Sequence, residues 1–457
     1  MSEEKENIQF ELTEELITQV EQLIEQKNDR ELRKLLKDFH YADIAEILDE
    51  VNLDEAMYVI KLLDSETTSD VLMELDDDNR EKVLQNLSAK EIAEEIEELD
   101  TDDAADMISE LSEERQREVI FHIEDEEHRA EITELLKYDE DTAGGLMAKE
   151  LVKVYETWTV AGCLRRIRGQ AKDVTRVHSI YVVDKKNKLI GRLSLKDLIV
   201  AKSEEKIADI YIKNVDYVKV DEDPEEVARV MAKYDLEAIP VVDEEMTLLG
   251  RITIDDIVDV LKEEADKDYQ LAAGITGDVE ADDSIWELTR ARLPWLLIGM
   301  FGGIGAASII NGFSDAMIKF PALLMFVPLI QATAGNVGVQ SSAIIVQGLA
   351  NDSLDGNMLN RLLKESLLGL VNGIAIACIV LLISHFAFQT TYYESLTICV
   401  ALIAVIIMAA LIGTFIPIFL DKRGIDAAVA TGPFITTSND VFGILMYFLI
   451  AKLILGF

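Results

Sequence analysis

The sequence predicts a multidomain membrane protein with an all-α N-terminal helical solenoid, a duplicated α+β domain and an α-helical five-span transmembrane domain. Three observations predict this class. An apolar residue recurs every twelve positions up to about residue 140, a longer pattern recurs after 59 positions, and long uncharged runs follow residue 286. At 457 residues the chain is long enough for several domains.

The first 140 residues are expected to form short helices joined by tight turns. Apolar residues recur every twelve positions at Val51, Leu63, Leu75, Leu87, Leu99, Leu111, Ile123 and Leu135. Each closes a stretch with helical apolar spacing, such as DAADMISEL. Twelve residues hold one short helix and a turn, so successive units pair and stack. We expect an acidic helical solenoid over residues 1–140, for which scaffolding is the simplest function.

A second repeat follows the solenoid. The segment HSIYVVDKKNKLIGRLSLKDLI (178–199) aligns without gaps to EAIPVVDEEMTLLGRITIDDIV (237–258), 59 positions later. Both copies contain a β-branched run, a charged turn, a strand that ends in Gly-Arg, and Ser or Thr before a helix. The pattern resembles the CBS domain, so we expect an α+β tandem CBS pair with modules at 141–203 and 204–262. Tandem CBS pairs usually regulate an attached machine.

The CBS resemblance also bears on nucleotide binding. In that family the pattern G-x-x-[ST]-x-x-[DN] can hold the ribose of an adenine nucleotide such as ATP; it is matched here by Gly191, Ser194, Asp197, Gly250, Thr253 and Asp256. The resemblance implies that Ser194, Asp197 and Thr253 bind an adenine nucleotide. The same spacing also fits a helix N-cap followed by an acid at the third helical residue. From the sequence, both interpretations stay open.

An acidic segment connects the second CBS module to the rest of the chain. Residues 255–271, DDIVDVLKEEADKDYQL, are expected to form one continuous helix, within a connecting helix and linker over 255–285. Its carboxylates stand three and four positions apart, where like charges destabilise a helix slightly. They form either a solvated face or a surface that awaits a divalent cation. Ser284 and Glu287 have the spacing of a capping box before the first span.

Long apolar segments fill the chain after residue 286. Uncharged runs cover 293–314, 320–351, 366–393 and 395–420, and a final apolar segment contains Asp440 as its lone ionisable side chain until Lys452. Each run exceeds the ~20 residues that cross a bilayer as a helix. We therefore expect a transmembrane domain with five helices over residues 286–457, in the cell membrane.

The distribution of charge predicts the orientation and excludes one class of partner. Basic residues gather before span one, between spans two and three, and between spans four and five: Arg290, Arg292, Arg361, Lys364, Lys422 and Arg423. The loops on the other side of the membrane hold only Lys319. By the positive-inside rule the N-terminal part is cytoplasmic and the C-terminus is outside. The opening MSEEKENIQF is not expected to be a signal peptide. The formal charge of −43 arises almost entirely before residue 286, and such a domain repels nucleic acid and attracts cations.

Two features of the membrane part point to a transport site. The second run carries Pro328 and then Gly335, Asn336 and Gln340 near its middle. Two interpretations stay open for this run: a helix broken at a transport site, or close packing of small residues with Asn336 and Gln340 bonding across helices. Asp440 lies in the last segment, and a carboxylate at the bilayer centre costs about 2.5–3.5 kcal/mol. It should therefore face the interior of the bundle and have a partner. The alternative is an N-cap of a shorter span that begins after it.

The ligands around Asp440 favour a hard cation. No basic residue lies in the first four spans, so a cation from solution is the economical partner for this carboxylate. The available ligands are the oxygens of Asp440, Thr436, Thr437 and Asn336, with no thiol or imidazole. Mg²⁺ keeps much of its water and usually contacts one or two carboxylates. One aspartate per chain, doubled in a symmetric dimer, suits a largely hydrated Mg²⁺.

The whole chain is similar to the MgtE family of magnesium channels. The resemblance lies in the domain order and in the runs PLIQATAGNVGVQSS and GPFITTSND. It implies a Mg²⁺-selective channel for magnesium uptake, without enzyme activity, that forms a homodimer with a pore lined by spans two and five. The pore residues it implies are Asp440 and, through its carbonyl, Thr436; Asn336 and Gly335 of span two are the further candidates for the pore. It also implies closure by cytosolic Mg²⁺ at regulatory ligands Asp70, Asp102, Asp106, Glu225, Asp235, Asp256, Asp259, Glu264, Asp268 and Asp426.

Two other functions remain open from the sequence. The first is an ion-coupled carrier that exchanges Mg²⁺, or Mn²⁺ and Co²⁺, for Na⁺ or H⁺. The second is a CBS-regulated membrane sensor without flux, in which Asn439 and Asp440 only pack. Enzyme activity is the weakest hypothesis, because the sequence has no nucleophile–base pair, P-loop or metal-hydrolase motif.

Overall fold

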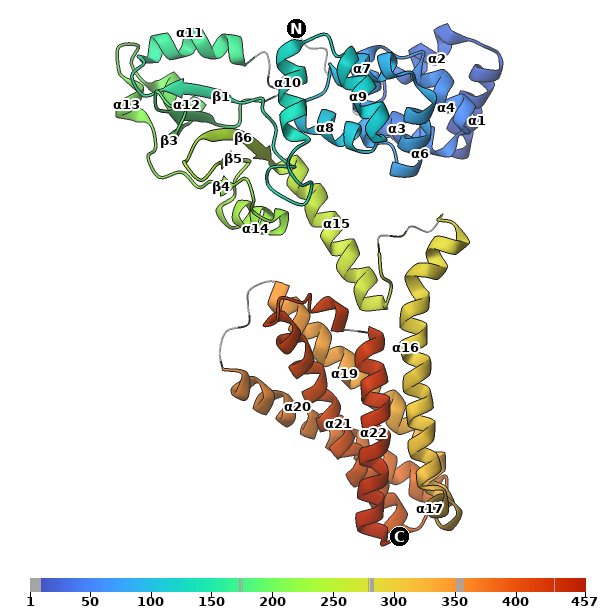
Figure 1. Cartoon of the computed structure of the whole chain (residues 1–457). Coiled ribbons are helices and arrows are strands. Elements are labelled where there is room, and N and C mark those ends of the chain that lie inside the picture. The colour runs from blue at the N-terminus through green and yellow to red at the C-terminus, as the bar shows by residue number, and fades with distance from the viewer. Residues whose placement is uncertain are drawn as a thin grey trace. The chain divides into compact units, whose positions relative to one another are not determined.

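The computed structural model describes residues 10–171, 174, 176–277, 279, 283–350, 354, 357–430 and 432–457. The chain divides into two compact units, Met1–Leu261 and Lys262–Phe457, and each is described by itself. The first unit contains the helical solenoid and two α+β modules, and the second contains the long apolar helices (Figure 1).

The solenoid consists of short helices with polar caps. Their bounds are α1 Glu14–Glu25, α2 Asp29–Leu36, α3 Tyr41–Glu50, α4 Leu53–Ile60, α5 Ser65–Glu74, α6 Asp77–Asn86, α7 Ala89–Ile96, α8 Thr101–Ser109, α9 Glu113–His122 and α10 Glu126–Leu135. Capping boxes start α3, α4 and α7, as Ser88 with Glu91 does for α7. From α3 to α10, each helix packs mainly against a helix two places away, as in the pairs α3–α5, α4–α6, α5–α7, α7–α9 and α8–α10. The predicted all-helical N-terminal domain is confirmed, and repeat positions such as Leu87 and Ile123 are buried at helix ends.

The two CBS modules have the same topology. Their elements are β1 Val152–Tyr155, α11 Val160–Gln170, β2 Ile180–Val183, β3 Leu189–Leu193 and α12 Leu195–Val200, then α13 Ile207–Ile210, β4 Val218–Lys219, α14 Pro224–Tyr234, β5 Ala238–Val242 and β6 Leu248–Thr253. In each sheet the first strand pairs parallel to the second, and the second pairs antiparallel to the third. Both sheets have an irregularity at the same repeat position, after Val182 and after Val241. The predicted tandem α+β pair is confirmed.

The connecting segment is a single helix, α15 Ile254–Ala273, as predicted. It leaves β6 directly and its first turn carries Asp255 and Asp256. The helix passes from the first unit into the second, where it ends. The predicted capping box of Ser284 and Glu287 is also present, at the start of the next helix.

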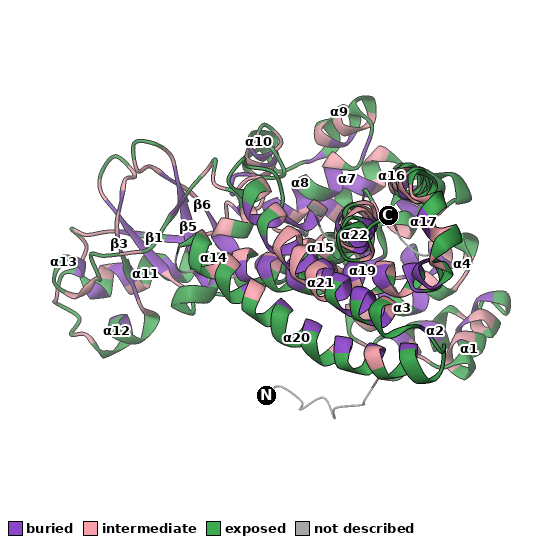
Figure 2. Ribbon diagram, turned by 90° about the horizontal axis from the view of Figure 1, so that it is seen from below, coloured by how far each residue is buried: buried purple, intermediate pink, exposed green. Residues whose placement is uncertain are grey.

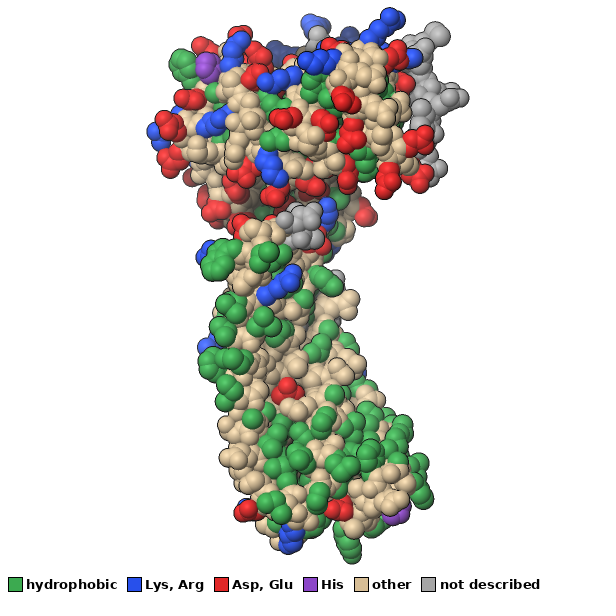
Figure 3. All heavy atoms as spheres, turned by 90° about the vertical axis from the view of Figure 1, so that its right-hand side faces the viewer, with side chains coloured by type: hydrophobic (Ala, Val, Ile, Leu, Met, Phe, Trp, Pro, Cys, Tyr) green, Lys and Arg blue, Asp and Glu red, His purple; other side chains and the backbone are tan. Residues whose placement is uncertain are grey.

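The second unit contains five helices that are long and apolar enough to cross a membrane. The elements of this unit after α15 are α16 Ile285–Gly312, α17 Ser314–Lys319, α18 Pro321–Met325, α19 Val327–Ala350, α20 Met358–Phe386, α21 Tyr392–Asp421, η1 Ala428–Ala430 and α22 Gly432–Leu455. In Figure 3 hydrophobic side chains cover much of the visible face of this unit, whereas carboxylates crowd the visible face of the first. The predicted five-span transmembrane domain is confirmed.

Helix α21 forms the centre of the helix bundle. It contacts α19, α20 and α22, and its inner residues are buried, whereas α20 shows many exposed residues on its outer side (Figure 2). Glycines allow close approach, since a methyl group on Gly369 would lie 3.2 Å from the Cα of Ile407. In a lipid bilayer the burial of apolar side chains does not drive helices together, so close contacts at small residues stabilise their association instead.

The structure decides between the two interpretations of the second span. A helix break near Gly335 to Gln340 is wrong, because α19 runs without interruption from Val327 to Ala350, and Gly338 in this stretch packs closely against α21 and α22. The break lies earlier, between α18 and α19 at Phe326, just before Pro328. This position has a physical reason, because proline is tolerated in the first turn of a helix, where its missing N–H is not needed.

Candidate functional site

Asp440 lies inside α22, eight residues after the helix begins at Gly432. At 1.5 Å per residue that is roughly 12 Å along the helix axis. The N-cap interpretation is therefore wrong. Its side chain is half-buried, and among the described residues no ion pair or hydrogen bond to its carboxylate is recorded. The carboxylate of Asp440 is thus partly accessible and, in the described part of the chain, has no neutralising partner, as a cation site requires.

The other predicted pore residues lie on α19 and α22. Gly335 and Thr436 are neighbours, because a methyl group on Gly335 would lie 3.3 Å from Cγ2 of Thr436. The hydroxyl of Thr436 donates to the carbonyl of Gly432 at 2.9 Å, so it is occupied within its own helix. Asn336 is exposed on the surface of the single chain. The structure thus brings Gly335 and Thr436 together and leaves Asn336 on an open face.

A junction of three helices lies beside Asp440, and sequence reasoning did not find it. Asn439 is completely buried, and neither polar atom of its side chain has a hydrogen-bond partner among the residues that the structure describes. Its amide lies against Gly338 of α19. On the same glycine, the carbonyl faces Gly413 of α21. Pro417 stands four residues after Gly413 within α21 and has no N–H, so the carbonyl of Gly413 lacks its usual helical donor. The core of the bundle therefore holds unmet polar groups next to the candidate pore aspartate.

A second intramembrane carboxylate was also missed. Glu365 in α20 retains 8 % exposure and accepts a long hydrogen bond of 3.4 Å from Ser341 Oγ in α19. The sequence hid it because Lys364 precedes it and the predicted span began one residue later. Helix α20 in fact begins at Met358. A signal existed, since Glu365 is followed by an uncharged run that extends to His385.

In the first unit, carboxylates gather where the solenoid meets the second CBS module. We call Asp100, Asp102, Asp103, Asp106, Glu150, Asp255 and Asp256 the acidic cluster. Ligand atoms of Asp100, Asp102 and Glu150 lie within 4.8 Å of one another, the one such group found among the described residues. Asp102, Asp106 and Asp256 were predicted by resemblance, whereas the other four were not. The hydroxyl of Thr101 donates to Glu150 at 2.8 Å and so fixes one member.

Burial and mutual repulsion shift the protonation of the acidic cluster. Burial, followed by the charge of Glu150, raises the pKa of Asp100 to about 6. Burial, followed by the charge of Asp256, raises the pKa of Asp103 to about 8. The pKa of Asp102 is raised in the same direction, chiefly by burial. Carboxylates crowded in this way repel one another, so a divalent cation between them would reduce the electrostatic free energy of the ionised cluster.

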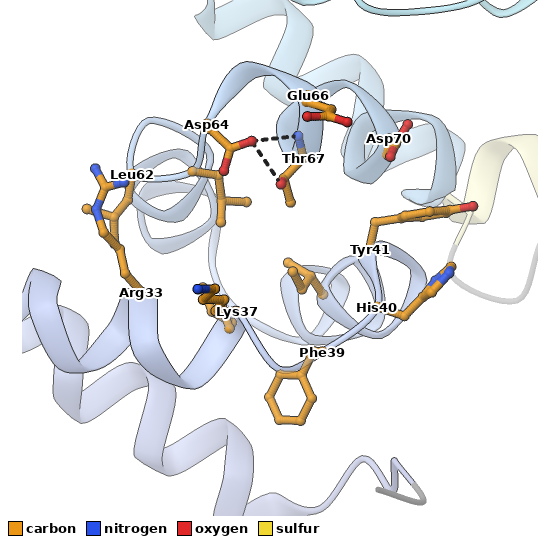
Figure 4. Close-up of a pocket in the computed structure, with 13 residues that line it drawn as sticks. Arg33, Lys37, Phe39, His40, Tyr41, Leu62, Asp64, Glu66, Thr67 and Asp70 are labelled. Carbon is orange, nitrogen blue, oxygen red and sulfur yellow. Dashed lines mark hydrogen bonds between the residues drawn. The ribbon is translucent and has the colours of Figure 1, made fainter. Parts of the chain in front are cut away.

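Asp70 lies farther along the solenoid, in a cavity of about 540 Å³ (Figure 4). Asp64 in the same cavity caps α5 and accepts hydrogen bonds from the backbone and the hydroxyl of Thr67. Burial, and then the charge of Glu66, raises the pKa of Asp70. Glu74, one turn along α5, has its pKa raised by burial and then by Asp259 of α15. The solenoid thus approaches α15 at a second acidic point, which includes the predicted Asp259.

The predicted ligands of the second unit lie near the end of α15. Burial, and then the charge of Asp426, raises the pKa of Asp268. Glu264 instead forms an ion pair with Lys267 at 3.0 Å. The helix end then contacts the start of α22, where a methyl group on Gly432 would meet the carbonyl of Ala272. Helix α15 therefore ends directly against the helix that carries Asp440.

Two further predicted ligands are not gathered with the others. Glu225 lies in the first turn of α14, and Asp235 is the C-cap residue of the same helix with a left-handed backbone, φ 50°. They are ten positions apart, which is about 15 Å along the helix axis. They therefore stand at opposite ends of α14, and their role as ligands stays a prediction.

The candidate nucleotide residues act as helix caps in this structure. Ser194 Oγ accepts from the backbone N–H of Lys196 at 3.1 Å, at the start of α12. The hydroxyl of Thr253 donates to Asp256 at 2.8 Å, and the same carboxylate accepts from the Thr253 backbone N–H at 3.0 Å. Asp197 lies in the first turn of α12. The capping interpretation therefore describes these residues as they stand.

Comparisons with families agree with this organisation. A family described as a divalent cation transporter, MgtE, matches residues 327–450. The MgtE intracellular N domain matches 39–141, and the CBS domain matches 143–204 and 207–263. A multi-pass membrane protein with an intracellular N domain is the arrangement that these matches describe.

Individual proteins match over long stretches. The chain is 36 % identical to the magnesium transporter MgtE of Thermus thermophilus, over 97 % of this chain and 99 % of the relative. It is 39 % identical to the magnesium transporter MgtE of Enterococcus faecalis, over 72 % of this chain and 73 % of the relative. A crystal structure of the cytosolic domain of the Mg²⁺ channel MgtE in complex with ATP is 38 % identical, with TM-score 0.51, and covers 53 % of this chain and 99 % of that one.

Proposed function

Because the chain belongs to the MgtE family of magnesium transporters, we propose that it is a Mg²⁺-selective channel for magnesium uptake whose opening is controlled by cytosolic Mg²⁺. The observation that carries the permeation part is Asp440. It is an ionisable residue within a membrane helix, half-buried and without a recorded basic partner among the described residues. An intramembrane acid of this kind requires a compensating charge, which a passing cation supplies.

The pore is proposed to form between two copies of the chain. Asn336 of α19 is exposed on the single chain, and Asp440 of α22 is partly so. In a symmetric homodimer the two Asp440 carboxylates would share one hydrated Mg²⁺, since this ion usually keeps several waters and contacts one or two carboxylates. Their mutual repulsion would favour a divalent over a monovalent cation.

Flux into proteoliposomes tests the permeation pathway. Asp440→Asn keeps the size of the side chain and removes its charge, so Mg²⁺ entry is expected to fall at least ~10-fold. A ten-fold loss corresponds to about 1.4 kcal/mol of lost interaction between the ion and the pore. Asp315→Asn, in the short helix α17, is the control that removes an acid elsewhere in the same unit and should retain flux. Undiminished entry through Asp440→Asn contradicts the proposed pathway. Linear single-channel currents would distinguish a channel from an exchanger.

The acidic cluster supports the regulatory part of the proposal. With little Mg²⁺, its carboxylates repel one another across the contact between solenoid, second CBS module and α15. Bound Mg²⁺ bridges them and favours one arrangement, which is a difference in affinity between two states. Helix α15 carries Asp255 and Asp256 at its start and contacts Gly432 of α22 at its end. A change at the cluster can therefore reach the helix that carries Asp440.

Limited proteolysis of the full chain tests this regulation. Millimolar Mg²⁺ is expected to slow cleavage in the 255–275 region, because the ion holds α15 against its neighbours. The replacement of both Asp102 and Asp256 by Asn should abolish this protection. As a control, Asp216→Asn changes an acid between α13 and β4 of the second module, outside the acidic cluster, and should respond to Mg²⁺ as wild type does. Identical cleavage with and without Mg²⁺ in the wild type argues against regulation by this ion.

An adenine nucleotide is proposed as a second ligand of the CBS pair. The support is the related cytosolic domain solved in complex with ATP, together with Ser194, Asp197 and Thr253 in the matching pattern. The hydroxyl of Thr253 would exchange its bond to Asp256 for one to the ribose. Titration calorimetry with ATP should give binding in the wild type and weaker binding in Asp197→Ala. Equal affinity in the two proteins refutes the assignment of Asp197.

A further inference from the structure

The first span begins with exposed apolar and basic side chains. Helix α16 has 28 residues, so it is about 42 Å long, which matches a bilayer together with both of its headgroup layers. Ile285 and Trp286 at its start retain 87 % and 77 % exposure. Arg290 is also exposed, and no ion pair is recorded for it among the described residues. Because the domain before this helix is intracellular, these side chains lie at the cytoplasmic headgroup layer.

Four exposed side chains of α16 lie along one line. At about 100° per residue, the following four project within about 60° of one another: Trp286, Arg290, Leu293 and Leu297. We call these four residues the α16 stripe. Its two leucines belong to the apolar span and are exposed, as side chains that contact acyl chains are. Trp286 and Arg290 continue the same line toward the cytoplasmic end, at the depth of lipid headgroups.

The opposite side of α16 is occupied by the linker that follows α15. Trp295 Nε1 donates to the hydroxyl of Thr276 at 2.6 Å, and the backbone N–H of Thr276 donates to the carbonyl of Ala291 at 3.1 Å. Trp295 and Ala291 project about 180° and 140° away from Trp286 around the helix. The linker at Thr276 therefore packs on the other side of α16 and leaves the α16 stripe uncovered.

The charges at the start of α16 favour an anionic partner. The acid of the first turn, Glu287, is occupied, because its carboxylate accepts from the backbone N–H and the hydroxyl of Ser284 at 3.1 and 2.5 Å. The guanidinium of Arg290 is thus the charge that the α16 stripe presents. Guanidinium groups bind phosphate through paired hydrogen bonds, and tryptophan is enriched at the membrane–water interface. Basic residues next to the cytoplasmic end of a span attract the anionic lipids of that leaflet.

We propose that the α16 stripe binds an anionic phospholipid of the cytoplasmic leaflet. Arg290 pairs with the lipid phosphate, Trp286 lies in the headgroup layer, and the two leucines contact the acyl chains. The occupant is a lipid and not a free phosphate, because half of the stripe is apolar and lies in the span. The bound lipid holds the first turns of α16 and, through the contacts of Thr276, the linker that leaves α15. The proposal requires only the transmembrane arrangement and is independent of the route that Mg²⁺ takes.

Native mass spectrometry of the full chain in detergent, with phosphatidylglycerol added, tests this proposal. The method counts bound lipids and gives the mass of the assembly. Arg290→Gln is expected to weaken phosphatidylglycerol binding about five-fold, the factor that one basic residue near an anionic surface contributes. The matched control is Arg292→Gln, which removes the same charge about 160° around the helix and should bind as wild type does. Other basic residues remain in both variants, so their difference reports the stripe.

Three results would overturn the proposal. The first is equal binding of phosphatidylglycerol by Arg290→Gln and Arg292→Gln. The second is displacement of the lipid by glycerophosphoglycerol, the headgroup without acyl chains, which would assign the site to a free phosphate. In the third, Trp286→Ala changes the mass of the assembly, which would make the stripe a contact between two copies of the chain. The expected result for Trp286→Ala is weaker lipid binding at an unchanged mass of the assembly.

Discussion

The side-chain amide of Asn439 lies directly against the α-carbon of Gly338, where α22 crosses α19. A methyl group at position 338 would overlap this amide and would lie 2.7 Å from Cγ2 of Ile435. Consecutive residues of an α-helix point about 100° apart. Because Asn439 is fixed inside the bundle, the next side chain, Asp440, is turned toward a more open side. The rotational setting of the candidate pore helix is thus determined by one glycine.

Gly338→Ala is therefore expected to reduce Mg²⁺ flux strongly without removing the protein from the membrane. The new methyl group must displace Asn439 and Ile435, which moves α22, and overpacking of this kind costs about 1–3 kcal/mol. Flux into proteoliposomes, normalised to reconstituted protein, measures the effect. The matched control is Gly299→Ala in α16, where a methyl group meets no atom within 4 Å. Equal flux in the two variants would show that α22 tolerates the displacement.

Gly274→Ala is expected to change the Mg²⁺ dependence of gating more than the flux at low Mg²⁺. Gly274 follows α15 with φ +77°, and a methyl group there would overlap the ring of Pro433 in the first turn of α22. The substitution should loosen the contact between the two helices and shift the Mg²⁺ concentration that half-closes the channel. Channel recordings over a range of cytosolic Mg²⁺ give this value.

A second glycine supplies the control for that experiment. Gly277 has φ +96°, but a methyl group on it meets no atom within 4 Å. Gly277→Ala thus introduces the same kind of backbone strain, worth roughly 1–2 kcal/mol, without the clash. An equal shift in both variants would mean that strain in the linker, and not the contact with α22, controls the response.

The stability of the first unit is expected to depend on pH when Mg²⁺ is absent. The pKa values of Asp100 and Asp103, about 6 and about 8, lie above the ordinary carboxyl value. A raised folded-state pKa favours folding in the protonated form. Its contribution is complete below about pH 4 and is lost as pH rises through these values. Solenoid protection in amide hydrogen exchange should therefore fall between about pH 5 and pH 8.5 in EDTA.

Mg²⁺ and neutral substitutions give the matching controls for this pH dependence. Saturating Mg²⁺ binds the ionised carboxylates, so the decline in protection should become smaller. Asp103→Asn should also flatten it, since the amide does not titrate. A decline that persists unchanged in Asp103→Asn would assign the pH dependence to other groups.

The sequence was sufficient for the order and type of the elements. The patterns that predict helices, strands and spans are local: the twelve-residue spacing of apolar residues, the 59-residue repeat and the five apolar runs. They are informative because the side chains on the buried face of an element recur at a fixed spacing in the sequence. The capping box of Ser284 and Glu287 could be predicted for the same reason. Asp440 could be found because a lone charge in an apolar run is visible without any knowledge of packing.

The tertiary structure decided the contacts between residues far apart in the chain. Asp100 and Glu150 belong to the acidic cluster because the solenoid packs against the second CBS module. Asn439 is buried without a hydrogen-bond partner among the described residues because its amide packs against Gly338 of α19. Arg192 and Arg251 occupy equivalent positions in similar local sequences, yet one is exposed and the other pairs with Asp100. Local patterns fix which face of an element is apolar, but the electric field and the free volume at a side chain are set by whichever distant segment packs against it.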